Sequence, residues 1–218
     1  MSNIKPGREV MVVGVGLHPF GRFPDKDLGD LAIEAVLSAL EDARVKWQDV
    51  AIAYFGHVYY QGMSIGETTL SKLGLTGVPI VNVENACSSG STAFWQAYWG
   101  ITTGLYDMAL AFGAEKVPRG PVTVTAEDAP ERYIGGDHMM AGYALRGKRY
   151  MEETGAPATA LAEVSVKARK NAAMNPYAHR KDTYTIEEVL NSRMVADPLT
   201  LFQCCLLYPY PRPRDDTI

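Results

Sequence analysis

The sequence is poor in cysteine and histidine, and this scarcity excludes several kinds of site. It contains three cysteines and four histidines in 218 residues. Two of the cysteines are adjacent, so they do not form the framework of a disulfide-rich domain. No Cys-x-x-Cys or His-x-x-x-His spacing occurs, and Gly14-x-Gly16 lacks the third glycine of a dinucleotide fingerprint. We therefore expect neither a metal site nor a bound cofactor.

Long apolar runs and a strong charge of either sign are also missing. No apolar stretch approaches the ~20 residues of a membrane helix, and the first residues do not combine a basic segment, an apolar core and a cleavage site. The formal net charge of -4 gives no electrostatic reason to expect nucleic acid or an anionic membrane surface as a partner. These properties, with 47% hydrophobic residues, are typical of a cytoplasmic globular protein.

What the sequence does contain is an alternation of short apolar runs with amphipathic segments. The apolar runs predict strands over residues 9–16, 50–58, 80–83 and 108–113. The segments with helical periodicity predict helices over residues 27–43, 64–73 and 89–104, and, after a loop at 116–136, over 137–153, 157–175 and 186–193. Thr185 and Glu188 predict a capping box before the last helix. Such an order predicts an α/β fold with a mostly parallel mixed sheet covered by helices.

Cys87 is the candidate catalytic residue because of its place in this order. It follows the predicted strand 80–83 and precedes the predicted helix 89–104, within the segment Val83-Glu84-Asn85-Ala86-Cys87-Ser88-Ser89-Gly90-Ser91. The free N–H groups and the positive dipole end of a helix favour a thiolate over a thiol. A thiolate there would be a nucleophile without help from a metal. The alternative is a packing role, since cysteine is among the most buried residue types.

The sequence around Cys87 resembles the thiolase superfamily, and within it the sterol-carrier-protein-type thiolases and related enzymes of steroid and aromatic acyl-CoA breakdown. The similar stretches are the cysteine segment and residues 12–16, 19–23, 104–116, 140–144 and 161–165. The resemblance covers residues 9 to about 204. It implies a thiolase-like fold in which residues 1–117 form the N-terminal half with the nucleophile and residues 118–204 form a helical loop domain over the acyl-CoA site.

Other motifs that the resemblance leads us to expect do not occur in the sequence. The second half of a thiolase carries a histidine in a His-Asp-Cys-Phe-like or Asn-Glu-Ala-Phe-like segment, a second histidine in Gly-His-Pro and a cysteine in Cys-x-Gly. Only the nucleophile is found here, so we expect this chain alone to lack a complete active site. The proline-rich residues 205–218 predict a disordered tail. A frameshift or early stop after Cys205 is our leading explanation, and a deliberately short protein is the alternative.

Coenzyme A is expected as a substrate and not as a bound cofactor. In the family the loop domain supplies basic residues around the nucleotide, so Arg169 and Lys170 are candidates to meet its phosphates, although a solvated helix face would show the same pattern. His57 could face the site from a strand end, but an isolated histidine is more often structural. Ser88, next to the nucleophile, is a further candidate substrate contact. Metal binding by any of these residues is not expected.

The resemblance also implies partners. The aromatic residues of the helix after Cys87 are expected to be buried in a homodimer, because thiolases pair through the strand that precedes this helix. A small zinc-ribbon and OB-fold protein is the alternative partner, since an exposed sheet face needs a cover.

The function that this resemblance implies is that of an acyl-CoA C-acyltransferase in lipid metabolism, which cleaves 3-oxoacyl-CoA through an acyl group on Cys87. Two alternatives stay open. One is a thiolase-like aldolase that acts on steroid or aromatic acyl-CoA side chains and forms no cysteine acyl-enzyme. The other is a non-catalytic protein that kept the fold and binds acyl-CoA or another protein.

Overall fold

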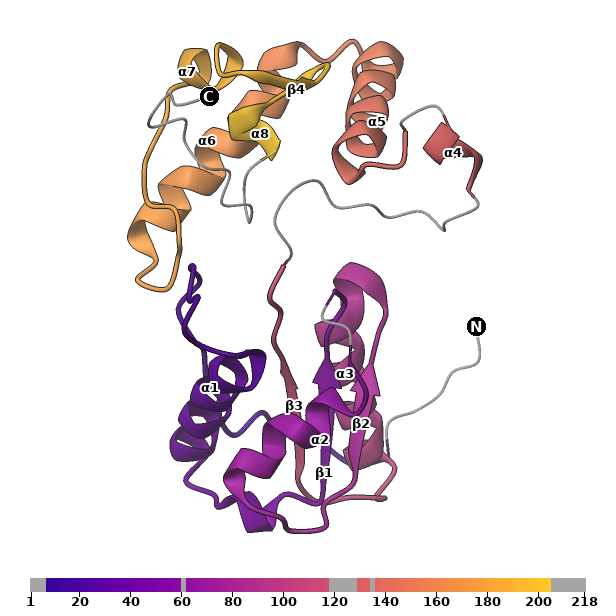
Figure 1. Cartoon of the computed structure of the whole chain (residues 1–218), viewed down its shortest axis with the longest axis vertical. Helices are drawn as coiled ribbons and strands as arrows, with labels where there is room; N and C mark the ends of the chain where they lie inside the picture. The colour runs from indigo at the N-terminus through magenta and orange to yellow at the C-terminus, as the bar shows by residue number, and fades with distance from the viewer. Residues whose placement is uncertain (1–6, 60–61, 118–128, 134–135, 205–218) are drawn as a thin grey trace. The chain divides into compact units, whose positions relative to one another are not determined.

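The computed structural model describes residues 7–59, 62–117, 129–133 and 136–204. The chain divides into two compact units (Figure 1). Unit 1 consists of residues 1–18 and 23–117, and unit 2 of residues 19–22 and 118–218. The predicted tail, residues 205–218, lies outside the described residues.

Three parallel strands form the sheet of unit 1 in the order β2-β1-β3. The central strand β1 (Ile52–Gly56) pairs with β2 (Ile80–Val83) on one side and with β3 (Ala109–Gly113) on the other. Every residue of β1 is buried, as expected for a parallel strand covered on both faces. The parallel sheet that the alternation of elements predicts is therefore confirmed.

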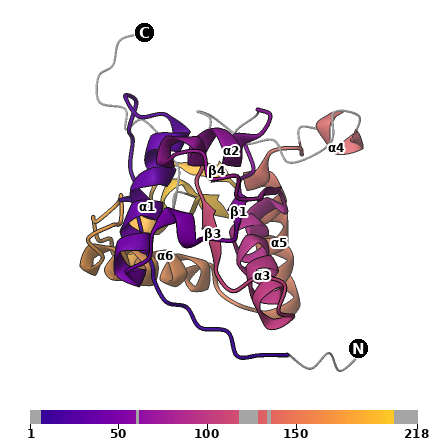
Figure 2. The ribbon, with the colours of Figure 1, turned by 90° about the horizontal axis from the view of Figure 1, so that it is seen from below.

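Helices cover both faces of this sheet. α1 (Leu28–Ala43) and α2 (Ile65–Leu70) pack on one face, and α3 (Ser89–Thr102) packs on the other. Figure 2 shows α1 and α3 on opposite sides of β1 and β3. Short 3-10 turns lie at Trp47–Asp49 and Ser71–Leu73.

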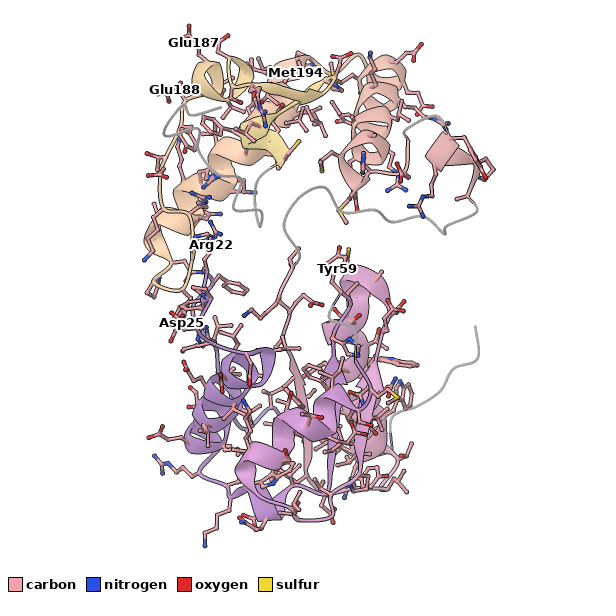
Figure 3. All side chains as sticks on the ribbon, in the orientation of Figure 1. Arg22, Asp25, Tyr59, Glu187, Glu188 and Met194 are labelled. Atoms are coloured by element: carbon pink, nitrogen blue, oxygen red, sulfur yellow. The ribbon has the colours of Figure 1, made fainter. Side chains whose placement is uncertain are left out.

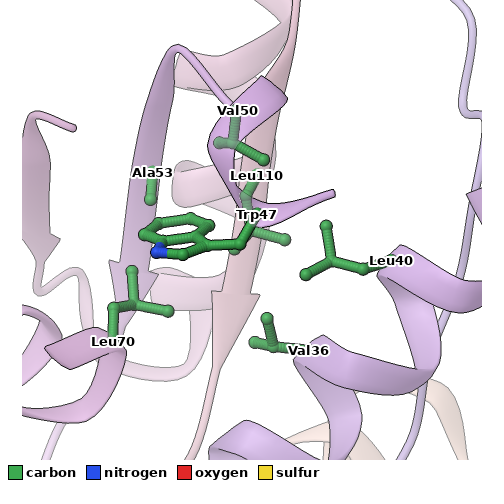
Figure 4. Close-up of a cluster of buried hydrophobic side chains, with 7 residues drawn as sticks. All are labelled: Val36, Leu40, Trp47, Val50, Ala53, Leu70 and Leu110. Carbon is green, nitrogen blue, oxygen red and sulfur yellow. The ribbon is translucent and has the colours of Figure 1, made fainter. Parts of the chain in front are cut away.

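The side chains of β1 alternate between the two layers of helices. Ala53 points into the larger cluster, which Figure 4 shows around the Trp47 ring and which consists of Val36, Leu40, Trp47, Val50, Ala53, Leu70 and Leu110. Ile52 and Tyr54 point the other way, toward Val83 and the small residues of α3.

The start of α1 shows why the chain becomes helical at this point. Asp27 is the N-cap, and a capping box joins it to Asp30: each carboxylate accepts a hydrogen bond from the other residue's backbone N–H. The Lys72 ammonium lies 2.8 Å from Asp27 Oδ1 and 2.7 Å from Asp30 Oδ1. These ion pairs connect the start of α1 to the turn after α2.

The prediction of a buried strand over residues 9–16 is wrong. The segment forms no strand, and its apolar side chains Met11, Val12, Val13 and Val15 are 54–69% exposed. The described bonds of its backbone lead elsewhere. The Val15 N–H donates to the carboxylate of Asp42 in α1 at 2.9 Å, and just before the segment the Arg8 N–H donates to the carbonyl of Thr102 in α3 at 3.1 Å. The apolar run is real, but no neighbouring strand among the described residues pairs with it.

Unit 2 is mostly helical in its described part. It contains α4 (Pro130–Tyr133), α5 (Met139–Thr154), α6 (Ala158–Met174), α7 (Ile186–Leu190) and α8 (Leu201–Cys204). The strands β4 (Met194–Ala196) and β5 (Leu199–Thr200) form an antiparallel pair between α7 and α8. Sequence reasoning predicted the three longer segments as helices but extended the last one to residue 193, into the approach to β4.

The predicted capping box before α7 is confirmed. The Glu188 N–H donates to the Thr185 hydroxyl at 3.1 Å, and the Thr185 N–H donates to the Glu188 carboxylate at 2.8 Å. Figure 3 labels Glu188 at the start of this helix. The buried Thr200 hydroxyl donates to the carbonyl of Val189 at 2.6 Å and so ties β5 to the end of α7.

Candidate active site

The strand–turn–helix arrangement predicted around Cys87 is present in unit 1. After β2 the chain makes one 3-10 turn, η3 (Ala86–Ser88), and then enters α3 at Ser89. Cys87 lies in the middle of η3 and is an exposed free thiol. Exposure favours a reactive role over the packing role that the residue type alone would suggest.

A close approach of two backbones fixes the position of α3 against the sheet. Gly56 ends β1, and a Cβ added there would lie 2.9 Å from the Gly90 nitrogen and from the Ser89 carbonyl oxygen. Real Cβ atoms do not come so close to backbone, so only glycine fits without a shift of α3. This contact fixes the position of the first turn of α3, and the turn that contains Cys87 lies directly before that helix.

Hydrogen bonds hold the turn between β2 and α3. The Ser89 hydroxyl accepts from the Asn85 N–H at 2.9 Å and donates to the Ala86 carbonyl at 2.8 Å. The Asn85 side chain donates to the Thr92 hydroxyl at 2.9 Å, and the Ala86 N–H donates to the Glu84 carboxylate at 2.7 Å. Sequence reasoning missed this set. The spacing Glu-Asn-x-x-x-Ser over residues 84–89 shows only that side chains able to bond nearby backbone in a turn are present. It does not show which backbone groups they bond.

The structure places His57 at the end of β1 but not on the face that carries α3. The backbone N–H of His57 donates to the Val83 carbonyl at 3.2 Å. Its ring stacks on Phe55, with 5.4 Å between ring centroids, and Phe55 packs with Leu28 and Ile65 on the α1 and α2 side of the sheet. His57 and the start of α3 therefore lie on opposite faces, which favours a structural role.

The loop after His57 is held by a carboxylate at the end of the neighbouring strand. The backbone N–H groups of Val58 and Tyr59 both donate to Glu115 Oε2 at 2.7 Å. Figure 3 labels Tyr59 beyond the end of β1. Glu115 thus fixes the chain at the same edge of the sheet at which β2 leads into the cysteine turn.

Ser88 is exposed and is the N-cap residue of α3, but its side chain makes no capping bond. Its hydroxyl is therefore not occupied by the helix end. Its N–H donates to the Asn85 carbonyl at 2.9 Å, which closes η3.

The basic candidates Arg169 and Lys170 lie on α6 in unit 2 and have different surroundings. Arg169 is only 4% exposed, and its guanidinium lies 5.4 Å from the centroid of the Tyr184 ring. Lys170 is exposed. Burial and the ring contact favour packing as the main role of Arg169, whereas Lys170 is accessible to an anion.

Further cations gather near Arg169. The Phe20 N–H donates to the Tyr177 carbonyl at 2.9 Å, which brings the short segment with Arg22 to the loop after α6. Figure 3 labels Arg22 beside this loop. Partial burial lowers the pKa of His179, and the nearby Arg180, Arg22 and Arg169 lower it further. Positive charge is therefore concentrated at this end of unit 2.

In the part of the chain that the structure describes, none of the helices combines the length and the apolar character of a membrane span. The same part of the chain holds no group of three or more His, Cys, Asp or Glu side chains that could bind a metal ion.

The fold and the site together define a class of protein: a thiolase-like α/β domain, in which an exposed cysteine lies between a parallel strand and a helix. Residues 10–204 match the family model of the thiolase N-terminal domain. The chain therefore belongs to the thiolase family.

The proteins that the chain is similar to include a thiolase subunit and a sterol carrier protein. It is 42% identical over 208 residues to benzoylsuccinyl-CoA thiolase subunit BbsB of Thauera aromatica. The matched region covers 93% of this chain and 53% of that protein. The chain is 37% identical over 213 residues to sterol carrier protein 2 of Bos taurus, covering 90% of this chain and 39% of that protein. The resemblance to sterol-carrier-protein-type thiolases is thus confirmed, and the chain spans about half or less of the length of these relatives.

A solved structure agrees with this assignment. The Ltp2-ChsH2(DUF35) aldolase superposes with a TM-score of 0.75 at 27% sequence identity, covering 88% of this chain and 51% of that one. The predicted thiolase fold is confirmed.

Proposed function

We propose that this chain carries the nucleophile of a thiolase-type acyl-CoA C-acyltransferase, and that Cys87 is that nucleophile. The observation that carries the proposal is the exposed thiol in the turn between β2 and α3, in a chain of the thiolase family. The relative BbsB is named a benzoylsuccinyl-CoA thiolase subunit, which supports an acyl-CoA as the substrate.

The proposed reaction follows from the chemistry of a thiolate. The Cys87 sulfur attacks the C3 carbonyl of a 3-oxoacyl-CoA, and the bond between C2 and C3 then breaks. The C1–C2 fragment, still joined to the coenzyme A of the substrate, leaves as an enolate and takes up a proton at C2, while the rest of the acyl chain stays on Cys87 as a thioester. The thiol of coenzyme A then attacks the thioester on Cys87 and carries the acyl group away as a new acyl-CoA. The negative charge that develops on the carbonyl oxygen needs preorganised donors, and backbone N–H groups of the cysteine turn are candidates.

Coenzyme A also carries phosphates, for which unit 2 offers cations. We assign the phosphate contact to Lys170, which is exposed, before Arg169, which is buried beneath Tyr184. Ser88 remains a proposed contact for the acyl thioester, because its hydroxyl is exposed beside Cys87. His57 is a weaker candidate, since it lies on the other face of the sheet.

The direct test is to trap the acyl group. The full chain is incubated with an acyl-CoA, and the peptide that contains Cys87 is examined by mass spectrometry. The proposal predicts an acyl mass on that peptide, which disappears in Cys87→Ala and is removed by free coenzyme A. An acyl group on another residue, or on none, would contradict it. Lys170→Ala should weaken coenzyme A binding, whereas Arg149→Ala, which removes another exposed cation of unit 2, should not.

A thiolase-like aldolase is the second candidate, and the similarity to the Ltp2-ChsH2(DUF35) aldolase favours it. Such an enzyme would cleave a carbon–carbon bond without placing an acyl group on Cys87. Turnover that survives Cys87→Ala would favour the aldolase, and loss of turnover together with loss of the trapped acyl group would favour the thiolase.

We further propose a homodimer that forms through the β2 edge and the outer face of α3. β2 is an edge strand among the described residues, and Val81 on it is exposed. Phe94 and Trp95 on α3 are 53% and 59% exposed, and large exposed aromatic side chains mark an interaction surface. The alternative is a second protein, since the name of the Ltp2-ChsH2(DUF35) aldolase joins two components. Sedimentation of the wild-type chain and of the Trp95→Glu variant, each purified by itself, tells a dimer from a monomer.

A further inference from the structure

The turn that carries Cys87 contains a residue in an unfavourable backbone conformation. Ala86 has a φ of 46°, in the left-handed region that residues with a Cβ seldom adopt. It directly precedes Cys87, so its φ and ψ angles decide the direction in which the cysteine leaves the strand. A conformation of this kind persists only when the surrounding structure imposes it.

The side chains of Glu84 and Ser89 form hydrogen bonds with the peptide groups on either side of Ala86, and we call this pair of bonds the grip. The N–H of Ala86 belongs to the peptide that precedes it and donates to Glu84 Oε1 at 2.7 Å. The carbonyl of Ala86 belongs to the peptide that joins it to Cys87 and accepts from the Ser89 hydroxyl at 2.8 Å. Glu84 therefore fixes the peptide before Ala86, and Ser89 fixes the peptide after it.

Residues of α3 hold one side of the grip in place. Ser89 is 4% exposed and begins that helix, and its hydroxyl also accepts from the Asn85 N–H at 2.9 Å. Asn85 in turn donates to Thr92, one turn further along α3, at 2.9 Å. The strained residue is thus tied to the helix on one side and to the end of the strand on the other.

We propose that Glu84 and Ser89 are positioning residues for Cys87: they hold Ala86 in its left-handed conformation and so aim the cysteine sulfur and the Cys87 N–H at the substrate carbonyl. This inference rests on the proposed role of Cys87 as a nucleophile. Glu84 gives the sharper test, because its side chain is exposed and its replacement leaves the core intact.

The test separates the hydrogen bond of Glu84 from its negative charge. Glu84→Gln keeps an oxygen that accepts from the Ala86 N–H but removes the charge, and Glu84→Ala removes both. The rate at which an acyl-CoA acylates Cys87 is measured across pH. Glu84→Ala should lower the plateau rate about tenfold, the equivalent of one hydrogen bond, while Glu84→Gln stays within about threefold of the wild type. Glu41→Ala, an exposed glutamate of α1, is the matched control and should change nothing.

Two results would overturn the proposal. If Gln and Ala at position 84 change the rate equally and shift the midpoint of the pH profile, the charge of Glu84 acts and not its position. If Glu84→Ala acylates at the wild-type rate, the grip has no effect on the nucleophile.

A second measurement keeps the grip testable if the wild-type chain takes no acyl group, a result that would overturn the proposed function itself. Hydrogen exchange of the Ala86 amide reports the Glu84 bond directly. Exchange should become about tenfold faster in Glu84→Ala and remain slow in Glu84→Gln. Unchanged exchange in both variants would show that Glu84 does not hold Ala86, whatever Cys87 does.

Discussion

Gly56→Ala tests the link between the sheet and the cysteine turn. The new Cβ would lie 2.9 Å from the nitrogen of Gly90 and 2.9 Å from the carbonyl carbon and oxygen of Ser89. All three are backbone atoms, so they cannot move aside by a change of rotamer, and the first turn of α3 must shift. Overpacking of this kind costs typically 1–3 kcal/mol, and we expect about 2 kcal/mol here, or about 30-fold in the folding equilibrium.

The assay is equilibrium unfolding in urea, followed by the acylation rate of Cys87 in the variant under folding conditions. Gly90→Ala is the matched control: it lies in the same turn of α3, where an added Cβ meets nothing within 4 Å. Alanine favours a helix more than glycine does, so this control should be neutral or slightly stabilising. Gly56→Ala should slow acylation as well, because the turn with Cys87 is joined directly to the first residue of α3 and must shift when that helix shifts. Equal stability of the two variants would refute the close packing of β1 on α3.

Three further predictions concern the core, acid stability and assembly. Leu70→Ala, in the cluster around Trp47 with 1% exposure, should lower the free energy of unfolding by about 2–5 kcal/mol, whereas Leu75→Ala at 92% exposure should leave the urea midpoint unchanged. The hydrogen bond from Lys72 is the largest of the effects that lower the pKa of Asp27 below 3.8. The stability that this carboxylate contributes is therefore present above pH 3.8 and is lost as the pH falls through the lower folded-state pKa. Lys72→Met should reduce the loss of stability between about pH 5 and pH 2 in thermal melts, and an unchanged loss would contradict this prediction. Trp95→Glu should convert a dimer to a monomer in sedimentation, and a wild-type chain that is already monomeric would exclude the proposed interface.

Much of the fold could be predicted because local signals and tertiary packing agree. The helical spacing of seven apolar residues between positions 28 and 40 predicted α1, and four of them, Leu28, Ala32, Val36 and Leu40, are buried. The capping pair Thr185 and Glu188 predicted the start of α7. In both cases the periodicity and the cap are properties of a few consecutive residues, which a sequence shows directly.

Residues 9–16 show where this reasoning fails. A run such as Val12, Val13 and Val15 has high strand propensity, but a strand also needs a neighbour with free backbone groups. The described bonds near this segment go instead to Asp42 of α1 and Thr102 of α3. Propensity is local and pairing is not, so the apolar run alone was insufficient.

The candidate site also has some features that could be predicted from the sequence and others that could not. The place of Cys87 between a strand and a helix could be predicted, because each element has its own pattern and the cysteine falls between them. The bonds of Glu84 and Ser89 to Ala86 could not, because they depend on a left-handed φ that the sequence does not announce at an alanine. For His57, the register of β1 decided which face the ring occupies, and a shift of one residue would have reversed it.

The central claim is that Cys87 is an acyl-accepting nucleophile, and the most direct measurement is mass spectrometry of the Cys87 peptide after incubation with a 3-oxoacyl-CoA. The account predicts an acyl adduct on the Cys87 sulfur that forms in the wild-type chain, is absent in Cys87→Ala and is discharged by coenzyme A. Cleavage of the substrate with an unmodified Cys87, at a rate that Cys87→Ala retains, would contradict it.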